Sequence, residues 1–141
     1  MKKPIPQEDN LGCGVACTAF AAGKTYREVR PLFDDKKILR DGVYSTDIVR
    51  VLKNFGLNYD FAKVNDENYH LTLLDNAIVF IPYSKSDPVG HWLVRYNGKY
   101  MDPWVNRHER YNLNARADFV DELPSRPEWV AFPTDKKEEE K

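Results

Sequence analysis

The chain has 141 residues, of which 42% are hydrophobic, 13% aromatic and 30% charged. This length fits one domain, and the hydrophobic fraction is sufficient to bury a core. The 21 basic residues nearly cancel the 22 acidic ones, and a formal net charge of -1 gives no electrostatic footprint for a nucleic acid or an anionic membrane. The composition therefore predicts a globular domain and argues against both of these partners.

The amino-terminal segment lacks the apolar run of a signal peptide, and no stretch approaches the roughly 18 apolar residues of a membrane helix. We therefore expect a cytoplasmic protein, with secretion as an effector and the oligomeric state left open. Cys13 and Cys17 are the only cysteines, too few for a secreted disulfide scaffold. In a reducing compartment such thiols pack, bind a metal or react.

Two helices are predicted near the start of the chain. Residues 13–22 show apolar residues at helical spacing, and Gly23 follows as a stop signal. Thr25 and Glu28 then form a capping box that opens a second helix, which Pro31 keeps short. The long apolar run of the first helix indicates that it lies in the core.

A third helix is expected to begin at a Ser45 cap and to end at Gly56. Beyond it the period changes to that of strands, which are predicted over 57–64, 77–83, 91–97 and 99–104. The apolar residues 129–132 predict a further strand at the edge of the sheet. The order of elements predicts an α+β fold, with N-terminal helices packed on a C-terminal antiparallel sheet. One domain is expected over residues 1–133, followed by a charged, disordered tail over 134–141.

Cys13 is the candidate nucleophile. It occupies the first turn of its predicted helix, where unpaired N–H groups and the helix dipole stabilise a thiolate relative to a thiol. Gly14 is expected to leave the approach to the sulfur free of a side chain and to border the substrate. Cys17 lacks this position, and because cysteine usually packs as a small hydrophobe we expect Cys17 in the core.

His91 is the candidate general base, because a histidine titrates near neutral pH. Of the three histidines, it alone begins a predicted strand directly after a turn, whereas His70 and His108 follow or lie within polar segments. Taken alone, a packed structural role for His91 is as strongly expected as a catalytic one.

Asp102 is the candidate third member of this group. Asn97 and Gly98 are typical of a two-residue hairpin turn, and the register that this turn sets places Asp102 opposite Leu93. Since His91 shares the face of Leu93, the carboxylate lies diagonal to the imidazole and within its reach. It would hold the ring tautomer and stabilise the imidazolium. By itself, Asp102 is equally typical of a turn residue before proline.

Three segments resemble the C39 and C39-like peptidases, a papain-fold group that includes the processing domains of bacteriocin exporters. They are Gln7 to Cys17 (QEDNLGCGVAC), Gly90 to Val94 (GHWLV) and Tyr100 to Pro103 (YMDP), in the order of that family. The resemblance spans approximately residues 5 to 105. It departs from the exporter peptidases at Gly12, where they usually have an acidic residue.

The resemblance implies a papain-like cysteine protease fold and a role for each matching residue. Gln7 is the implied side-chain donor of an oxyanion hole, Cys13 the nucleophile, His91 the general acid and base, and Asp102 the group that orients His91. No cofactor and no metal are expected. The predicted activity is that of a cysteine peptidase or amidohydrolase, which cleaves a peptide or isopeptide bond in a peptide or protein substrate.

Other readings stay open at this point. The same residues would serve an acyltransferase or a glutamine deamidase of the toxin or effector type, and a catalytically silent binding module would retain the fold. A metal site would instead use Cys13, Cys17 and His91. Four aromatic residues are candidates for a substrate groove, although aromatic residues in strands are more often core: Tyr83, Trp92, Tyr100 and Trp104. Of these, Trp92 and Trp104 are predicted to contact substrate.

Overall fold

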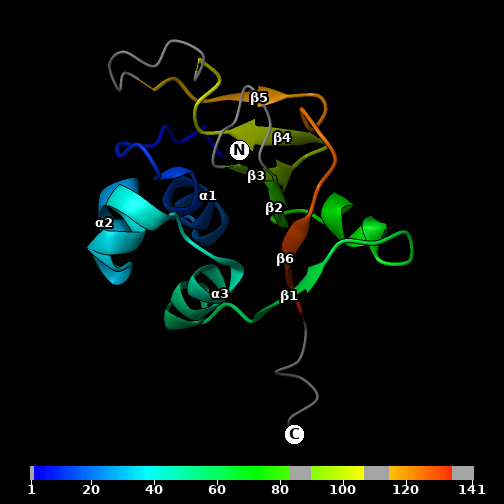
Figure 1. Ribbon diagram of the computed structural model, residues 1–141, viewed down its shortest axis with the longest axis horizontal. Coiled ribbons are helices and arrows are strands. Elements are labelled where there is room, and N and C mark those ends of the chain that lie inside the picture. The colour runs from blue at the N-terminus through cyan, green and yellow to red at the C-terminus, as the bar shows by residue number, and fades with distance from the viewer. Residues whose placement is uncertain (1, 83–89, 107–114, 135–141) are drawn as a thin grey trace, which may run out of the picture.

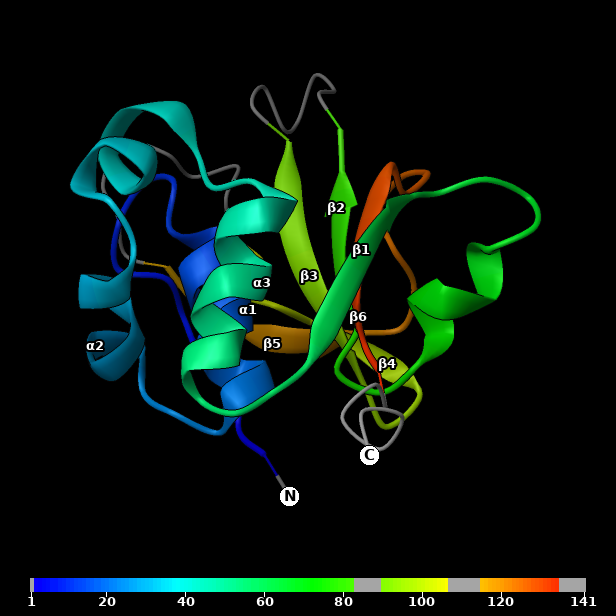
Figure 2. The ribbon, with the colours of Figure 1, turned by 90° about the horizontal axis from the view of Figure 1, so that it is seen from below.

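Helices cover one face of an antiparallel sheet in the computed structural model, which describes residues 2–82, 90–106 and 115–134 (Figures 1 and 2). Three α-helices come first: α1 (Cys13–Ala22), α2 (Tyr26–Val29) and α3 (Ser45–Asn54). Short helical turns lie between or after them: η1 (Arg30–Leu32), η2 (Lys37–Asp41) and η3 (Tyr69–Leu73). Of the described residues, none forms a helix of the length and apolarity needed to cross a membrane.

The sheet has six strands in the order β1-β6-β2-β3-β4-β5, and every neighbouring pair is antiparallel. The strands are β1 (Tyr59–Lys63), β2 (Ile78–Ile81), β3 (His91–Tyr96), β4 (Lys99–Asp102), β5 (Asp118–Val120) and β6 (Trp129–Pro133). One hydrophobic cluster fills the space between the helices and the sheet, and a second lies on the opposite face. The predicted α+β class, with N-terminal helices on a C-terminal antiparallel sheet, is confirmed.

Helix α1 is buried on nearly all sides and packs on β3. Its length matches the predicted residues 13–22, and Gly23 ends it in the left-handed conformation with φ of 70°. The N–H of Gly23 and that of Lys24 then donate to carbonyls of the last turn, 3.3 and 2.9 Å away. A helix apolar on every face is typical of a core helix, so α1 is a rigid base for the residue that begins it.

The predicted helix starts are correct for α2 and wrong for α3. Thr25 caps α2 through the expected box with Glu28. For α3 the cap is Tyr44, whose extended backbone N–H donates to the Asp47 carboxylate at 2.8 Å, and Ser45 is the first helical residue. The acidic side chain three residues after Tyr44 supplies half of a capping box, and this bond decides the boundary.

The final strand was predicted at the sheet edge, and that prediction is wrong because β6 lies between β1 and β2. Val130 belongs to the cluster behind the sheet and Ala131 to the cluster under the helices, both fully buried. A strand that is apolar on both faces is typical of the sheet interior. The edges are β1 and the three-residue β5, which the sequence did not predict. Residues 135–141 of the predicted tail lie outside the described residues, and the domain boundaries stay a prediction.

The β3–β4 hairpin has the predicted turn and register. Asn97 and Gly98 have φ of 54° and 81°, and Tyr96 pairs with Lys99. Gly98→Ala should therefore lower the free energy of unfolding by about 1 kcal/mol, since a Cβ is strained at this φ. Asn97→Gly at the adjacent position is the matched control, and urea denaturation measures both. Equal stability of the Gly98→Ala and Asn97→Gly variants would contradict the turn.

Gly14 is buried, and its neighbours explain why it is glycine. A Cβ at this position would overlap the Val43 side chain and lie 3.3 Å from Trp92 Cδ1. The sequence suggested that Gly14 clears the approach to the Cys13 sulfur. The structure gives a packing reason instead, because the side of α1 at Gly14 faces other side chains.

Gly14→Ala should therefore destabilise the protein by about 1–3 kcal/mol, the usual cost of an overpacked core. Val43→Ala removes the methyl group that the new Cβ meets, so the double variant should lose less stability than the sum of the two single variants. Urea denaturation of the four proteins measures this coupling. Strict additivity would contradict the proposed contact.

Candidate active site

A buried ion pair joins the two strands of the β3–β4 hairpin. His91 begins β3 and Asp102 ends β4, and His91 Nε2 lies 2.7 Å from Asp102 Oδ1. Their side chains are 4% and 3% exposed, so water does not screen the pair. The same Asp102 oxygen accepts a hydrogen bond from the backbone N–H of Trp104 at 2.9 Å. This second bond helps to fix the orientation of the carboxylate toward the His91 ring. The hairpin register therefore brings together the two residues that it was predicted to bring together.

Cys13 comes to this pair from the helical layer. It is the first residue of α1, where N–H groups have no intrahelical acceptor, and it is half-buried, while Cys17 is fully buried. Because α1 packs on β3, Cys13 and His91 lie close enough for their side chains to hydrogen-bond. His91 Nε2 is bound to Asp102, which leaves Nδ1 as the ring nitrogen for the sulfur.

Burial and its neighbours act in opposite directions on the His91 imidazole. Burial alone would lower its pKa, but the hydrogen bonds and charges of Asp102 and Cys13 outweigh this effect and raise the pKa to about 9. The raised pKa favours the imidazolium, which can donate to both neighbours and supply a proton. Burial, with the nearby Cys13 and Asp102 charges, raises the pKa of the Cys17 thiol well above its usual value, so Cys17 is the less reactive cysteine.

Gln7 is buried beside this group and tied to it through the backbone. Its own N–H donates to the carbonyl of Pro103 at 3.2 Å, directly after Asp102. The side-chain Nε2 donates to the carbonyls of Asp9 and Asn10 at 2.9 and 3.1 Å. Because these two carbonyls take both hydrogens of the amide, a donor role at an oxyanion needs either a hydrogen shared with the oxyanion or the release of one carbonyl. Within the described part of the chain, Gln7 Oε1 is buried without a partner.

A largely apolar pocket of about 360 Å³ opens beside Cys13. Its walls come from the loop before α3 and from four strands or strand ends, and the larger side chains in it are Leu11, Val43, Tyr44, Phe61, Phe80, Trp92 and Trp129. Trp92 is held in place by an indole N–H bond to the Val43 carbonyl at 3.3 Å and by the Phe80 ring at 4.9 Å. Such a pocket can hold an apolar side chain next to the sulfur.

The aromatic residues suggested for the substrate groove lie in different parts of the structure. Trp92 lines the pocket, but Trp104 is half-buried in the turn after β4 and, with Gly14, is not among the described residues of the pocket wall. Tyr100 lies in the cluster on the opposite face of the sheet, where its hydroxyl donates to the Thr72 carbonyl at 3.1 Å. The structure thus gives Tyr100 a core role. Tyr83 lies outside the described residues.

The geometry that a metal site would need is not formed in the described ranges. No group of three or more His, Cys, Asp or Glu side chains is arranged there to hold a metal ion. Cys17 faces the core one turn behind Cys13 and is fully buried. Of the other two histidines, His70 lies in η3, and His108 is outside the described residues.

Most pocket residues were not predicted from the sequence. Val43 and Tyr44 follow the Asp41–Gly42 turn, and Phe61 and Trp129 lie on β1 and β6. The order of strands in the sheet brings these segments together. Local patterns carry no signal for that order, although the apolar run at residues 129–132 did identify the strand itself.

Comparison with known proteins places the fold. No protein-family model matches the sequence, and no curated protein gives a significant match. Among solved structures, the peptidase domain of Streptococcus ComA, a bifunctional ABC transporter involved in a quorum-sensing pathway, superposes with a TM-score of 0.60 and 20% identity. The match covers 95% of this chain and 98% of that domain.

The peptidase domain of Streptococcus mutans ComA gives a TM-score of 0.53 and 21% identity, over 94% of this chain and 98% of that one. At these identities the likeness shows the fold. The match also extends well past residue 105, where the sequence resemblance ends. This chain therefore has the papain-like α+β fold of the C39 peptidase domains, with helices packed on a six-stranded antiparallel sheet.

Proposed function

We propose that this protein is a cysteine peptidase in which Cys13 is the nucleophile, His91 the general acid and base, and Asp102 the group that orients His91. The observation that carries this proposal is the buried His91–Asp102 pair, 2.7 Å apart, at the start of the helix that presents Cys13. The fold shared with peptidase domains agrees with it. A nucleophile, a base and an orienting group held side by side are the arrangement that this chemistry uses.

The reaction begins when the Cys13 thiolate attacks the carbonyl carbon of an amide, and the C=O π electrons move to oxygen. The Cys13 backbone N–H stabilises this oxyanion together with a Gln7 N–H, which is shared with its carbonyl acceptor or released from it. The His91 imidazolium then gives its proton to the nitrogen, the C–N bond breaks, and the amine leaves a thioester on the sulfur. Neutral His91 takes a proton from water, the resulting hydroxide attacks the thioester, and the carboxylic acid and the thiolate are released.

The pocket beside Cys13 indicates the class of substrate. Its wall is built largely from aromatic and aliphatic side chains, and it is open to solvent on one side. We therefore expect a peptide or protein substrate that inserts an apolar side chain next to the scissile bond. Incubation with a peptide library, followed by mass spectrometry, identifies the product, and Cys13→Ala is the control. Hydrolysis gives two fragments, whereas deamidation leaves the peptide whole.

Alkylation tests the nucleophile directly. At pH 6 Cys13 should react rapidly with iodoacetamide, and His91→Ala should slow it by about 100-fold, since an ordinary thiol is almost fully protonated there. Cys17→Ser is the control and should change the rate little. Peptide mapping by mass spectrometry gives the rate at each cysteine. An alkylation rate that does not depend on His91 would contradict the proposal that His91 activates Cys13.

The pH profile tests the general acid. Hydrolysis of an amide found in the library screen should fall as the pH rises through about 9, because His91 then loses the proton that the leaving amine needs. In Asp102→Asn the fall should move to lower pH, since a hydrogen bond that raises the pKa of His91 is lost.

Iodoacetamide provides the control for this profile, because iodide leaves without a proton. Alkylation of Cys13 should therefore show no fall over the same pH range. A parallel loss of both rates above pH 9 would indicate unfolding, and an alkaline limb unmoved by Asp102→Asn would show that another group supplies the proton.

A further inference from the structure

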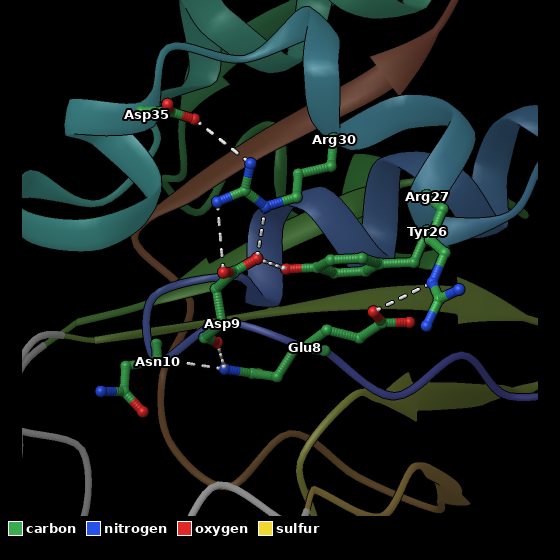
Figure 3. A network of polar contacts seen from close by, with 8 residues as sticks. Glu8, Asp9, Asn10, Tyr26, Arg27, Arg30 and Asp35 are labelled. Carbon is green, nitrogen blue, oxygen red and sulfur yellow. Dashed lines mark hydrogen bonds and ion pairs between the residues drawn. The ribbon is translucent and has the colours of Figure 1, made fainter.

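A second polar cluster lies behind the loop that leads into Cys13, on the side of α2 (Figure 3). Asp9 receives Arg30 Nε at 2.8 Å and Nη2 at 3.3 Å, and the Tyr26 hydroxyl donates to Asp9 Oδ2 at 2.7 Å. Arg30 also donates to Asp35 at 3.2 Å. Three donor atoms from two residues therefore hold one carboxylate in a fixed orientation.

The Asp9 end of the cluster is shielded from water, whereas the Arg30 side chain is 31% and the Asp35 side chain 74% exposed. The Asp9 side chain is 15% exposed, and Tyr26 is buried. Burial would raise the pKa of the Asp9 carboxyl, but the hydrogen bonds from Arg30 and Tyr26 outweigh burial and lower it. Burial and the bond to Asp9 raise the pKa of the Tyr26 hydroxyl. At neutral pH the cluster is therefore a carboxylate with two committed donors.

This fixed carboxylate belongs to a residue whose backbone touches the candidate site. The Asp9 carbonyl accepts the N–H of Gly12 at 3.0 Å and Gln7 Nε2 at 2.9 Å. The adjacent Asn10 carbonyl accepts the same Gln7 nitrogen at 3.1 Å. The position of the Gln7 amide is thus set by main-chain atoms whose own position is set by Tyr26 and Arg30.

Gly12 closes the arrangement from the other side. A Cβ on Gly12 would overlap the Tyr26 hydroxyl and lie 3.1 Å from the Asp9 carbonyl oxygen. The Tyr26 side chain is therefore packed directly against the residue before Cys13. This packing explains why glycine occupies the position where exporter peptidases usually have an acidic residue.

We infer that Asp9, Tyr26 and Arg30 are positioning residues for the Gln7 amide, and that they act on the oxyanion without touching the substrate. The inference rests on the proposed function, because it requires Gln7 to act as an oxyanion donor. Their effect is confined to steps that build negative charge on a carbonyl oxygen.

Two reagents separate these effects. With p-nitrophenyl acetate the thiolate attacks the ester carbonyl, an oxyanion forms and collapses, and p-nitrophenolate leaves an acetyl group on Cys13. With iodoacetamide the thiolate displaces iodide from carbon, and no oxyanion forms. The ratio of the two second-order rates therefore measures oxyanion stabilisation, independently of how much thiolate is present.

Tyr26→Phe and Arg30→Met should each lower the acylation rate about tenfold, a part of the 10²–10³-fold loss that removal of an oxyanion donor causes. Their alkylation rates should stay within about twofold of the wild type. Arg27→Met is the matched control, because Arg27 follows Tyr26 in α2 and pairs with Glu8 of the same loop at 3.6 Å, but is 86% exposed. Neither of its rates should change.

A double-mutant cycle decides whether the cluster acts through Gln7. In a Gln7→Ala background the tenfold effect of Tyr26→Phe should disappear. An equal loss in that background, an unchanged rate ratio in both Tyr26→Phe and Arg30→Met, or a parallel loss of alkylation would each overturn the inference. A wild type that alkylates slowly and is not acylated would instead remove the proposed function, and this inference with it. Thermal melting of each variant checks that the fold is retained.

Discussion

The buried bond between His91 and Asp102 is the interaction on which the arrangement of the candidate site depends. A charged pair removed from water is costly unless its geometry is good and its remaining lone pairs accept hydrogen bonds. The hairpin register meets the first condition at 2.7 Å, and the backbone N–H of Trp104 contributes to the second. The turn after β4 then presents the Pro103 carbonyl to the N–H of Gln7. One corner of the sheet therefore holds both the Asp102 carboxylate and the segment from Gln7 that leads to Cys13.

Cys13, the proposed nucleophile, reaches this corner because α1 packs on the sheet. Helix α1 is buried along its length and rests on β3, so the position of Cys13 relative to His91 is fixed by the same core that holds the protein together. A catalytic group placed on a rigid element needs little reorganisation during a reaction. The cost is that there is little free space beside α1, since a Cβ on Gly14 would overlap the Val43 side chain and lie 3.3 Å from Trp92 Cδ1.

The parts of the fold that were predictable from sequence are those decided by near neighbours. The Thr25 capping box, the end of α1 at Gly23 and the turn at Asn97 and Gly98 each involve residues only a few positions apart. Strand order is different, because β6 joins β1 and β2 over a long sequence separation. The prediction of where α3 starts was wrong for another reason. Two adjacent residues competed for the cap, and a carboxylate at Asp47 rather than the serine hydroxyl decided it.

The same distinction applies within the site, and it separates two kinds of control. The His91–Asp102 geometry follows from a local hairpin, and it governs the protonation of the imidazole. The Gln7 orientation follows from Asp9, and through it from Tyr26 and Arg30 on the helical side. The family resemblance implied that Gln7 lies near Cys13, but a sequence motif does not specify which atoms the Gln7 amide contacts. In this fold, the protonation of His91 is therefore set by the sheet, whereas the placement of Cys13 and of the Gln7 amide is set by the helices.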